Sequence, residues 1–210
     1  MKSLTEKLLI NYSGKSYECG CDEAGRGCLA GPVVAAAVIL PAGFTSEELT
    51  DSKKLTENQR NRLRKTIEEN ALAWAVAFVS EQEIDTVNIL NASILAMHRA
   101  IGQLKIQPEF IIVDGNKFKP FKEIPHQTIV KGDSKYMSIA AASVLAKTHR
   151  DDFMLNLHHA YPQYGWKKNK AYATKEHRQA LMIHGYSEYH RISFRLDYSS
   201  DKDLFSDQSE

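Results

Sequence analysis

Residues 33–40 form an unbroken apolar run, Val-Val-Ala-Ala-Ala-Val-Ile-Leu. Gly31-Pro32 precedes the run and Pro41 follows it, so it has the length of a strand rather than of a helix. Such a run is typical of a strand buried inside a sheet. An apolar lead over residues 15–23 predicts a strand directly before it, joined to it by a glycine-containing loop.

The remainder of the chain alternates between helical and extended patterns. Capping residues and apolar periodicity predict helices over 56–70, 88–105 (closed by Pro108), 137–159 and about 174–184, and strands over 72–79, 110–113 and 126–130. The rest of region 161–195 reads as irregular. Strands first, followed by helices interleaved with strands, predict an α/β fold with a mixed sheet and helices on its faces.

Composition predicts a single globular domain over residues 1–196, which includes a helical C-terminal region from about residue 161. With 210 residues and 43% apolar content, the chain can bury a sizeable core. Residues 197–210 carry a net charge of −4 and predict an acidic, disordered tail. Because the whole chain carries +1, the first 196 residues carry +5, a balance that permits binding to a polyanion.

The sequence also bears on location, redox state and assembly. No apolar run reaches membrane-spanning length, and the first ten residues lack the apolar core of a signal peptide, so we expect a cytoplasmic protein without membrane contact. The three cysteines, Cys19, Cys21 and Cys28, are odd in number and lack a usual zinc spacing, which favours reduced thiols. Without heptads or a surplus apolar face, a monomer is expected.

Four carboxylates stand where predicted strands end: Asp22, Glu23, Asp114 and Asp133. In an open α/β sheet, ligands gather at the carboxyl ends of strands. An all-oxygen donor set without histidine or cysteine suits Mg²⁺ or Mn²⁺, and pairs of these ions commonly serve phosphoryl chemistry. The sequence therefore predicts a metal site at this edge of the sheet.

Neighbouring strand residues point to opposite faces, so Asp22 and Glu23 do not both reach one ion from a regular strand. Either the strand breaks at Glu23, or one of the two acids acts from outside the ligand set. Asp114 before a glycine also fits a simple turn, and Asp133 before a serine also fits a helix cap.

Gly25-Arg26-Gly27 offers backbone N–H groups and a guanidinium that suit a phosphate. A dinucleotide-binding fold would need a third glycine and a helix directly after the loop, where the apolar run indicates a strand instead. Ser52, Lys53 and Lys54 fit either a phosphate contact or a solvated loop.

Two further segments could contact nucleic acid. Ser143, Lys147 and Asp151 share one helical stripe, on which the lysine and the aspartate also fit an ordinary ion pair. Residues 166–172 interleave aromatic side chains with cations, as nucleic-acid surfaces do, although charge runs are usually solvated faces.

The run over residues 22–33 resembles the signature of ribonuclease HII, the bacterial type 2 ribonuclease H. Later blocks of that family are matched in the right order at residues 51–55, 113–116, 131–134, 138–147, 150–151, 161–162 and 170–174, with His177 after them. The resemblance covers about residues 15–190. Cys28, where proline is frequent, and Ala171, where glycine is frequent, depart from the pattern.

The resemblance implies a ribonuclease H-like fold and an endonuclease that cuts the RNA strand of RNA–DNA hybrids. It also implies incision 5′ of single ribonucleotides embedded in duplex DNA, leaving 3′-hydroxyl and 5′-phosphate ends. The implied catalytic acids and metal ligands are Asp22, Glu23, Asp114 and Asp133, which would hold two Mn²⁺ or Mg²⁺ ions once substrate is bound.

The implied substrate-binding residues are Gly25, Arg26, Gly27, Ser52, Lys53, Lys54, Ser143, Lys147 and Tyr172. Of these, the glycine-arginine-glycine loop would read the 2′-hydroxyl, and Tyr172 would pack on the following deoxyribose. Two alternatives stay open. A hybrid-binding protein without catalysis would have lost one of the four acids, which are all present, and a type 1 ribonuclease H or a resolvase would lack the loop.

Overall fold

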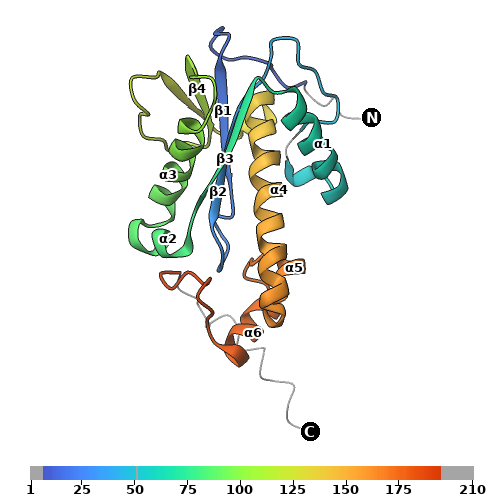
Figure 1. The fold of residues 1–210 in the computed structure, drawn as a ribbon, viewed down its shortest axis with the longest axis vertical. Coiled ribbons are helices and arrows are strands. Elements are labelled where there is room, and N and C mark those ends of the chain that lie inside the picture. The colour runs from blue at the N-terminus through green and yellow to red at the C-terminus, as the bar shows by residue number, and fades with distance from the viewer. Residues whose placement is uncertain (1–6, 51, 195–210) are drawn as a thin grey trace.

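The computed structural model describes residues 7–50 and 52–194. A mixed sheet with helices on both faces occupies one end of an elongated molecule, and the C-terminal helices occupy the other (Figure 1). The long helix α4 (Met137–Ala160) runs from one end to the other.

The sheet has five strands in the order β3-β2-β1-β4-β5. They are β1 (Glu18–Ala24), β2 (Val33–Ile39), β3 (Ala73–Val79), β4 (Phe110–Asp114) and β5 (His126–Ile129). β2 pairs antiparallel with both β1 and β3, whereas β4 pairs parallel with both β1 and β5. The predicted mixed sheet is therefore confirmed, and all seven residues of β2 are buried, as the apolar run predicts.

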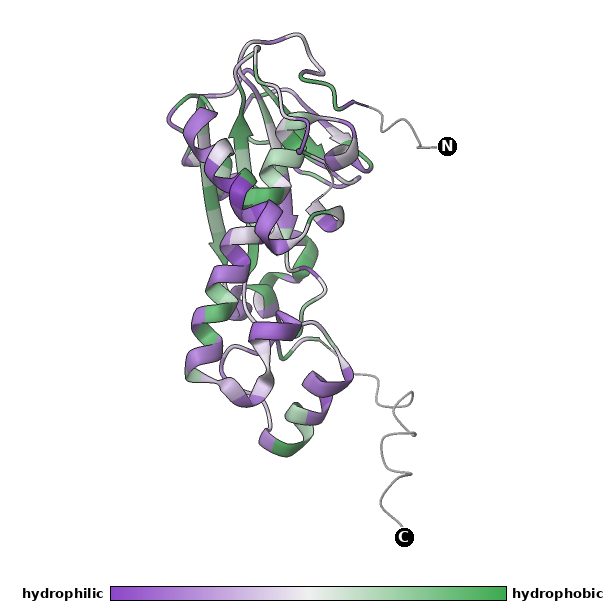
Figure 2. Cartoon of the chain, turned by 90° about the vertical axis from the view of Figure 1, so that its right-hand side faces the viewer, coloured by the Kyte–Doolittle hydropathy of each residue, from purple (hydrophilic) through white to green (hydrophobic). Residues whose placement is uncertain are grey.

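Helices cover both faces of this sheet. One face is covered by α2 (Glu81–Val87) and α3 (Ile89–Gly102), and the other by α1 (Glu57–Asn70) and α4. In Figure 2 the strands are coloured hydrophobic along much of their length, while the helices carry both kinds of residue. A β-carbon on Gly20 would lie 2.3 Å from the backbone carbon of Ser138, so α4 packs against β1 at backbone distance.

The C-terminal portion has a core of its own. It contains the short helices η3 (Pro162–Tyr164) and α5 (Trp166–Asn169) and the longer α6 (Lys175–His184). Their apolar residues pack with Met154 of α4 and with Cys28, Leu29 and Ala30 from the loop between β1 and β2. The loop that follows the acids of β1 is thereby built into the C-terminal portion.

The predicted cap at Thr56 and the predicted helix starts at Asn88 and Thr174 agree with the structure. Thr56 forms a capping box with Gln59 at the start of α1, Asn88 caps α3 and Thr174 caps α6. The strand predicted over 15–23 begins only at Glu18, and α3 ends at Gly102 rather than near Lys105. The short helices α2 and α5 were not predicted, because α2 is mostly polar and α5 lies in the region read as irregular.

Some predictions lie outside the described residues, namely the acidic tail at 197–210 and Asp51 of the lysine-containing loop. The three cysteines are free and buried. Within residues 7–50 and 52–194, no helix has the length and hydropathy to cross a membrane.

Candidate active site

The first two acids lie within β1, which continues unbroken to Ala24. Asp22 is paired with Ala36 of β2, and Glu23 with Ala35. The strand break at Glu23 that the sequence left open is therefore wrong. Because consecutive residues of a strand point to opposite faces, the two carboxylates leave β1 on different sides.

Asp22 is buried on the side of α4, where a hydrogen bond from the side chain of Ser143 partly offsets the rise in its pKa. Glu23 instead lines a hollow of about 310 Å³, open to solvent, on the side of α3. Asp114 lines the same hollow, as does Arg26.

Asp114 is the last residue of β4, the parallel neighbour of β1. Its Oδ1 accepts a hydrogen bond of 2.7 Å from the backbone N–H of Gly132. Gly132 opens the short helix η2 (Gly132–Ser134), which contains the buried Asp133. This hydrogen bond joins the carboxylate of Asp114 to the backbone of the residue that precedes Asp133, at the predicted edge of the sheet.

Three of the four carboxylates, those of Asp22, Glu23 and Asp114, interact electrostatically. Burial raises the pKa of Asp22 well above its usual range, and the charges of Glu23 and Asp114 raise it further. Burial also raises the pKa of Glu23, although the guanidinium of Arg26, 3.0 Å from Oε1, acts in the opposite direction. Ionising Asp22 and Glu23 together is therefore unfavourable without additional positive charge nearby.

This donor set fits a divalent cation, because carboxylate oxygens are the ligands that Mg²⁺ and Mn²⁺ prefer and the uncompensated charge favours a cation. In the part of the chain that the structure describes, no three Asp, Glu, His or Cys side chains are grouped closely enough to hold an ion as they stand. A bound ion would therefore take part of its coordination from water or substrate oxygens, or from a carboxylate in another rotamer.

The Gly25-Arg26-Gly27 loop leaves β1 beside the acids and leads into β2, not into a helix, which excludes the dinucleotide-binding arrangement. Gly25 has a φ of +91°, and a β-carbon there would lie 2.0 Å from Nε of Arg150. Glycine is required at this position for both reasons. Arg26 points out from the loop, with half of its side chain exposed.

Two buried arginines hold this loop through its backbone carbonyls. Arg150 of α4 is 1% exposed and donates hydrogen bonds of 3.0 Å to the carbonyl oxygens of Ala30 and Pro32. Its third hydrogen bond, also 3.0 Å, goes to the carbonyl of Lys170. One guanidinium therefore ties the loop to the C-terminal portion.

Arg191 is fully buried and binds the same loop. Its Nε and Nη2 donate to the carbonyl oxygen of Gly31 at 2.9 and 2.7 Å, and its Nη1 donates to that of Arg26 at 3.0 Å. Burial lowers the pKa of Arg191 to about 10, and the charge of Arg150 contributes to this shift. The sequence reasoning did not identify Arg191, because its acceptors lie about 160 residues away in the chain.

Tyr172 follows α5, and its side chain is 44% exposed. An antiparallel bridge joins it to Cys28, and the N–H of Leu29 donates to the carbonyl of Ala171 at 2.8 Å. Ala171 has a φ of +67°, so it adopts the left-handed conformation that favours the glycine usual at this position. Alanine in place of the family's glycine at position 171 therefore leaves a strained backbone next to Tyr172.

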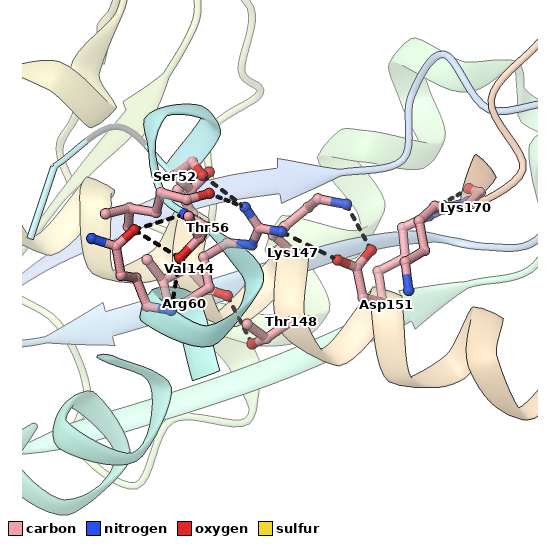
Figure 3. A network of polar contacts seen from close by, with 12 residues as sticks. Ser52, Thr56, Arg60, Val144, Lys147, Thr148, Asp151 and Lys170 are labelled. Atoms are coloured by element: carbon pink, nitrogen blue, oxygen red, sulfur yellow. Dashed lines mark hydrogen bonds and ion pairs between the residues drawn. The ribbon is translucent and has the colours of Figure 1, made fainter. Parts of the chain in front are cut away.

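A polar network positions the remaining candidates (Figure 3). The hydroxyls of Ser52 and Ser143 lie 2.8 Å apart, joining the short helix η1 (Ser52–Lys54) to α4. Asp151 lies between Lys147, at 2.6 Å, and Arg60, at 3.9 Å.

Lys53 and Lys54 of η1 complete the set of predicted residues. Nζ of Lys53 lies 3.8 Å from the carboxylate of Asp133, which places this lysine at the acid cluster. The side chain of Lys54 lies outside what the structure describes. Contact of η1 with a phosphate stays a prediction.

The fold is shared with known nucleases. The ribonuclease H2 of Pyrococcus horikoshii superposes with a TM-score of 0.74 at 25% identity, covering 85% of this chain and 93% of that one. A ribonuclease HIII, Bst-RNase HIII, solved in complex with Mn²⁺, has the same fold with a TM-score of 0.66 at 19% identity, over 84% of this chain and 66% of that one. Fold and acid cluster together define an enzyme of the ribonuclease H type.

Sequence comparison identifies the family within the ribonuclease H type. The family model described as Ribonuclease HII matches residues 19–197. A protein named Ribonuclease HII from Phocaeicola vulgatus is 60% identical over 190 residues, which cover 90% of this chain and 94% of that protein. The chain belongs to the ribonuclease HII family, an endoribonuclease family, and the resemblance seen in the sequence is confirmed.

Proposed function

We propose that this protein cleaves the RNA strand of RNA–DNA hybrids and also nicks duplex DNA on the 5′ side of a single embedded ribonucleotide. The products are 3′-hydroxyl and 5′-phosphate ends. The observation that carries the proposal is the backbone bridge between Cys28 and Tyr172. It sets the glycine-arginine-glycine loop, proposed to read the 2′-hydroxyl, next to the ring proposed to pack on the following deoxyribose.

The proposed metal ligands are Asp22, Glu23, Asp114 and Asp133, with two Mg²⁺ or Mn²⁺ ions in the substrate complex. Ions of this kind lower the pKa of a bound water and stabilise a leaving oxygen. The chain itself supplies the concentration of carboxylates, and its fixed elements keep them in place. Glu23 is held by Arg26, and Asp114 by the N–H of Gly132.

Discrimination against DNA rests on the 2′-hydroxyl, which is both a donor and an acceptor. The backbone of Gly25 and Gly27 and the guanidinium of Arg26 are proposed to bond it. A site with such polar groups rejects the deoxy analogue strongly, because its own donors would be left unpaired. Ser52, Lys53, Lys54, Ser143 and Lys147 are proposed to contact phosphates beside the cleaved bond.

The same proposal includes action as a monomer in the cytoplasm, where a bacterial chromosome lies. It also includes residues 1–196 as the catalytic domain, with 197–210 as an acidic appendage. The net charge of +5 over the first 196 residues supports attraction to nucleic acid.

A labelled DNA duplex with one ribonucleotide, incubated with and without Mg²⁺ or Mn²⁺, tests the proposal. An all-DNA duplex and the Asp22→Asn variant are the controls. We expect a metal-dependent nick 5′ of the ribonucleotide with wild type only. Binding without a nick would replace the proposal with a hybrid-binding role, and cutting restricted to long hybrids would indicate type 1 specificity.

A further inference from the structure

Two histidines of the C-terminal portion are buried against each other. His177 of α6 is fully buried and His190 is 2% exposed, and their Nε2 atoms lie 3.2 Å apart. Rings of Tyr164, Trp166 and Tyr186 surround His190. Neither histidine has a place in the proposed chemistry.

The surrounding donors fix the proton positions of both rings. Nε1 of Trp166 donates to Nε2 of His177 at 3.1 Å, so the proton of His177 must lie on Nδ1. That Nδ1 is 3.0 Å from the carbonyl oxygen of Tyr172, to which it donates. The N–H of Ser187 donates to Nδ1 of His190 at 2.9 Å, and the Ser187 hydroxyl lies 2.8 Å from the same nitrogen. With Nδ1 as the acceptor, the proton of His190 lies on Nε2 and faces Nε2 of His177, whose one lone pair it shares with the Trp166 donor.

Trp166 and His190 therefore converge on Nε2 of His177, and Nδ1 of His177 donates to the backbone of Tyr172. Each ring must be neutral, because a second proton on either would remove an acceptor that a neighbour uses. The backbone of His190 also bridges that of Ala30, which lies in the loop between β1 and β2.

We propose that His177 and His190 are a positioning pair for Tyr172. This inference rests on the proposed function, in which Tyr172 recognises the RNA-to-DNA junction. Tyr172 directly follows Lys170 and Ala171, whose φ values of +48° and +67° lie in the left-handed region that side chains disfavour. The histidine pair holds the carbonyl at the end of this strained turn and keeps the ring at a fixed place beside Cys28.

Two substitutions of His177 separate a positioning role from a merely structural one. In His177→Asn the amide nitrogen takes the place of Nδ1 and keeps a donor toward Tyr172. In His177→Gln the amide takes the place of Nε2, and the bond to Tyr172 is lost. The readout is the ratio of cleavage rates on a duplex with one embedded ribonucleotide and on a uniform RNA–DNA hybrid.

We expect His177→Gln to lower this ratio about tenfold or more, with uniform-hybrid cleavage within about threefold of wild type, and His177→Asn to retain most of the ratio. Equal losses on both substrates, or equal ratios for the two variants, would overturn the proposal. If wild type cleaves neither substrate, it is the proposed function that fails.

A double-mutant comparison and a spectroscopic measurement complete the test. In a Tyr172→Ala background, where no ring remains to be positioned, His177→Gln should lower the ratio no further, and a full additional loss would contradict the proposal. Should His177→Gln fail to fold, ¹⁵N NMR of the wild-type imidazoles decides. A proton on Nδ1 of His177 and on Nε2 of His190 is expected, and the opposite tautomer at His177 would overturn the pair.

Discussion

Gly25 lies directly against the side chain of Arg150, with no room for a β-carbon, which would lie 2.0 Å from Nε. Together with the φ of +91°, this contact predicts that Gly25→Ala lowers the free energy of unfolding by at least about 2 kcal/mol. Gly27→Ala is the matched control, because a β-carbon at 27 meets nothing within 4 Å. Chemical denaturation of both variants checks this, and equal effects would contradict the proposed steric role of Gly25.

Even the charge-conserving substitution of Arg191 by lysine is expected to destabilise the fold. Lysine keeps the charge but offers one nitrogen where the guanidinium donates from three, so at least one of the carbonyls of Gly31 and Arg26 loses its donor. We expect Arg191→Lys to cost about 2–4 kcal/mol of unfolding free energy and to reduce cleavage. Arg62→Lys, at an exposed ion pair with Glu48, should cost less than about 1 kcal/mol. Similar costs for both variants would show that the buried bonds carry no special weight.

Asp22→Asn should stabilise the metal-free protein while abolishing cleavage. The pKa of Asp22 is raised in the folded state above its ordinary value of 3.8, so stability falls as pH rises above that value and the buried carboxylate is a net cost at pH 7. Without metal we expect the variant to melt a few degrees higher than wild type. Added Mn²⁺ should raise the melting temperature of wild type only.

The exposed Glu47→Gln serves as the control for that charge removal, and it should leave both the melting temperature and the response to Mn²⁺ unchanged. An Asp22→Asn protein that melts below wild type in chelator would contradict the cost of the buried carboxylate. One that gains the full Mn²⁺ stabilisation would remove Asp22 from the metal site.

Because His190 is buried, we expect the free energy of unfolding to fall in mild acid. Burial, with a contribution from His177, lowers its pKa to about 4, whereas an unfolded histidine titrates near 6.5. Between these values the unfolded chain binds the extra proton, so this one group lowers the unfolding free energy by up to about 3 kcal/mol as pH falls from 6.5 to 4. No loss from this group occurs above pH 6.5.

The groups that face His190 are His177, Tyr164, Trp166, Tyr186 and Ser187. A His190→Gln variant should therefore show a flatter stability profile over this range than wild type, and the exposed His159→Gln should follow wild type. Parallel profiles for all three proteins would contradict a neutral, buried His190.

The strands and long helices were predictable because their signals are local. The apolar run that forms β2 needs no knowledge of its neighbours, and Thr56 and Asn88 mark helix starts through bonds within a few residues. The end of α3 was placed too late, because Pro108 limits how far a helix extends but does not force it to continue that far. α2 has too few apolar residues for a periodic signal.

Within the site, the acids were predictable from their positions after strands, but the two sides on which Asp22 and Glu23 emerge required the strand to be traced through Ala24. Arg191 and His190 were beyond local reasoning. Their partners are carbonyls and rings from distant segments, and a buried arginine or histidine resembles a surface residue until those segments are in place.

The continuity of α4 has a mechanical meaning. Ser143 near its start lies beside the acids, and Arg150 further along holds both the loop and the carbonyl of Lys170. A single helix of 24 residues, about 36 Å long, therefore links the proposed cutting position to the proposed junction-reading position. If this helix stays straight during recognition, the spacing between those positions is adjusted by the duplex, and the stiffness of the nucleic acid then contributes to the choice of substrate.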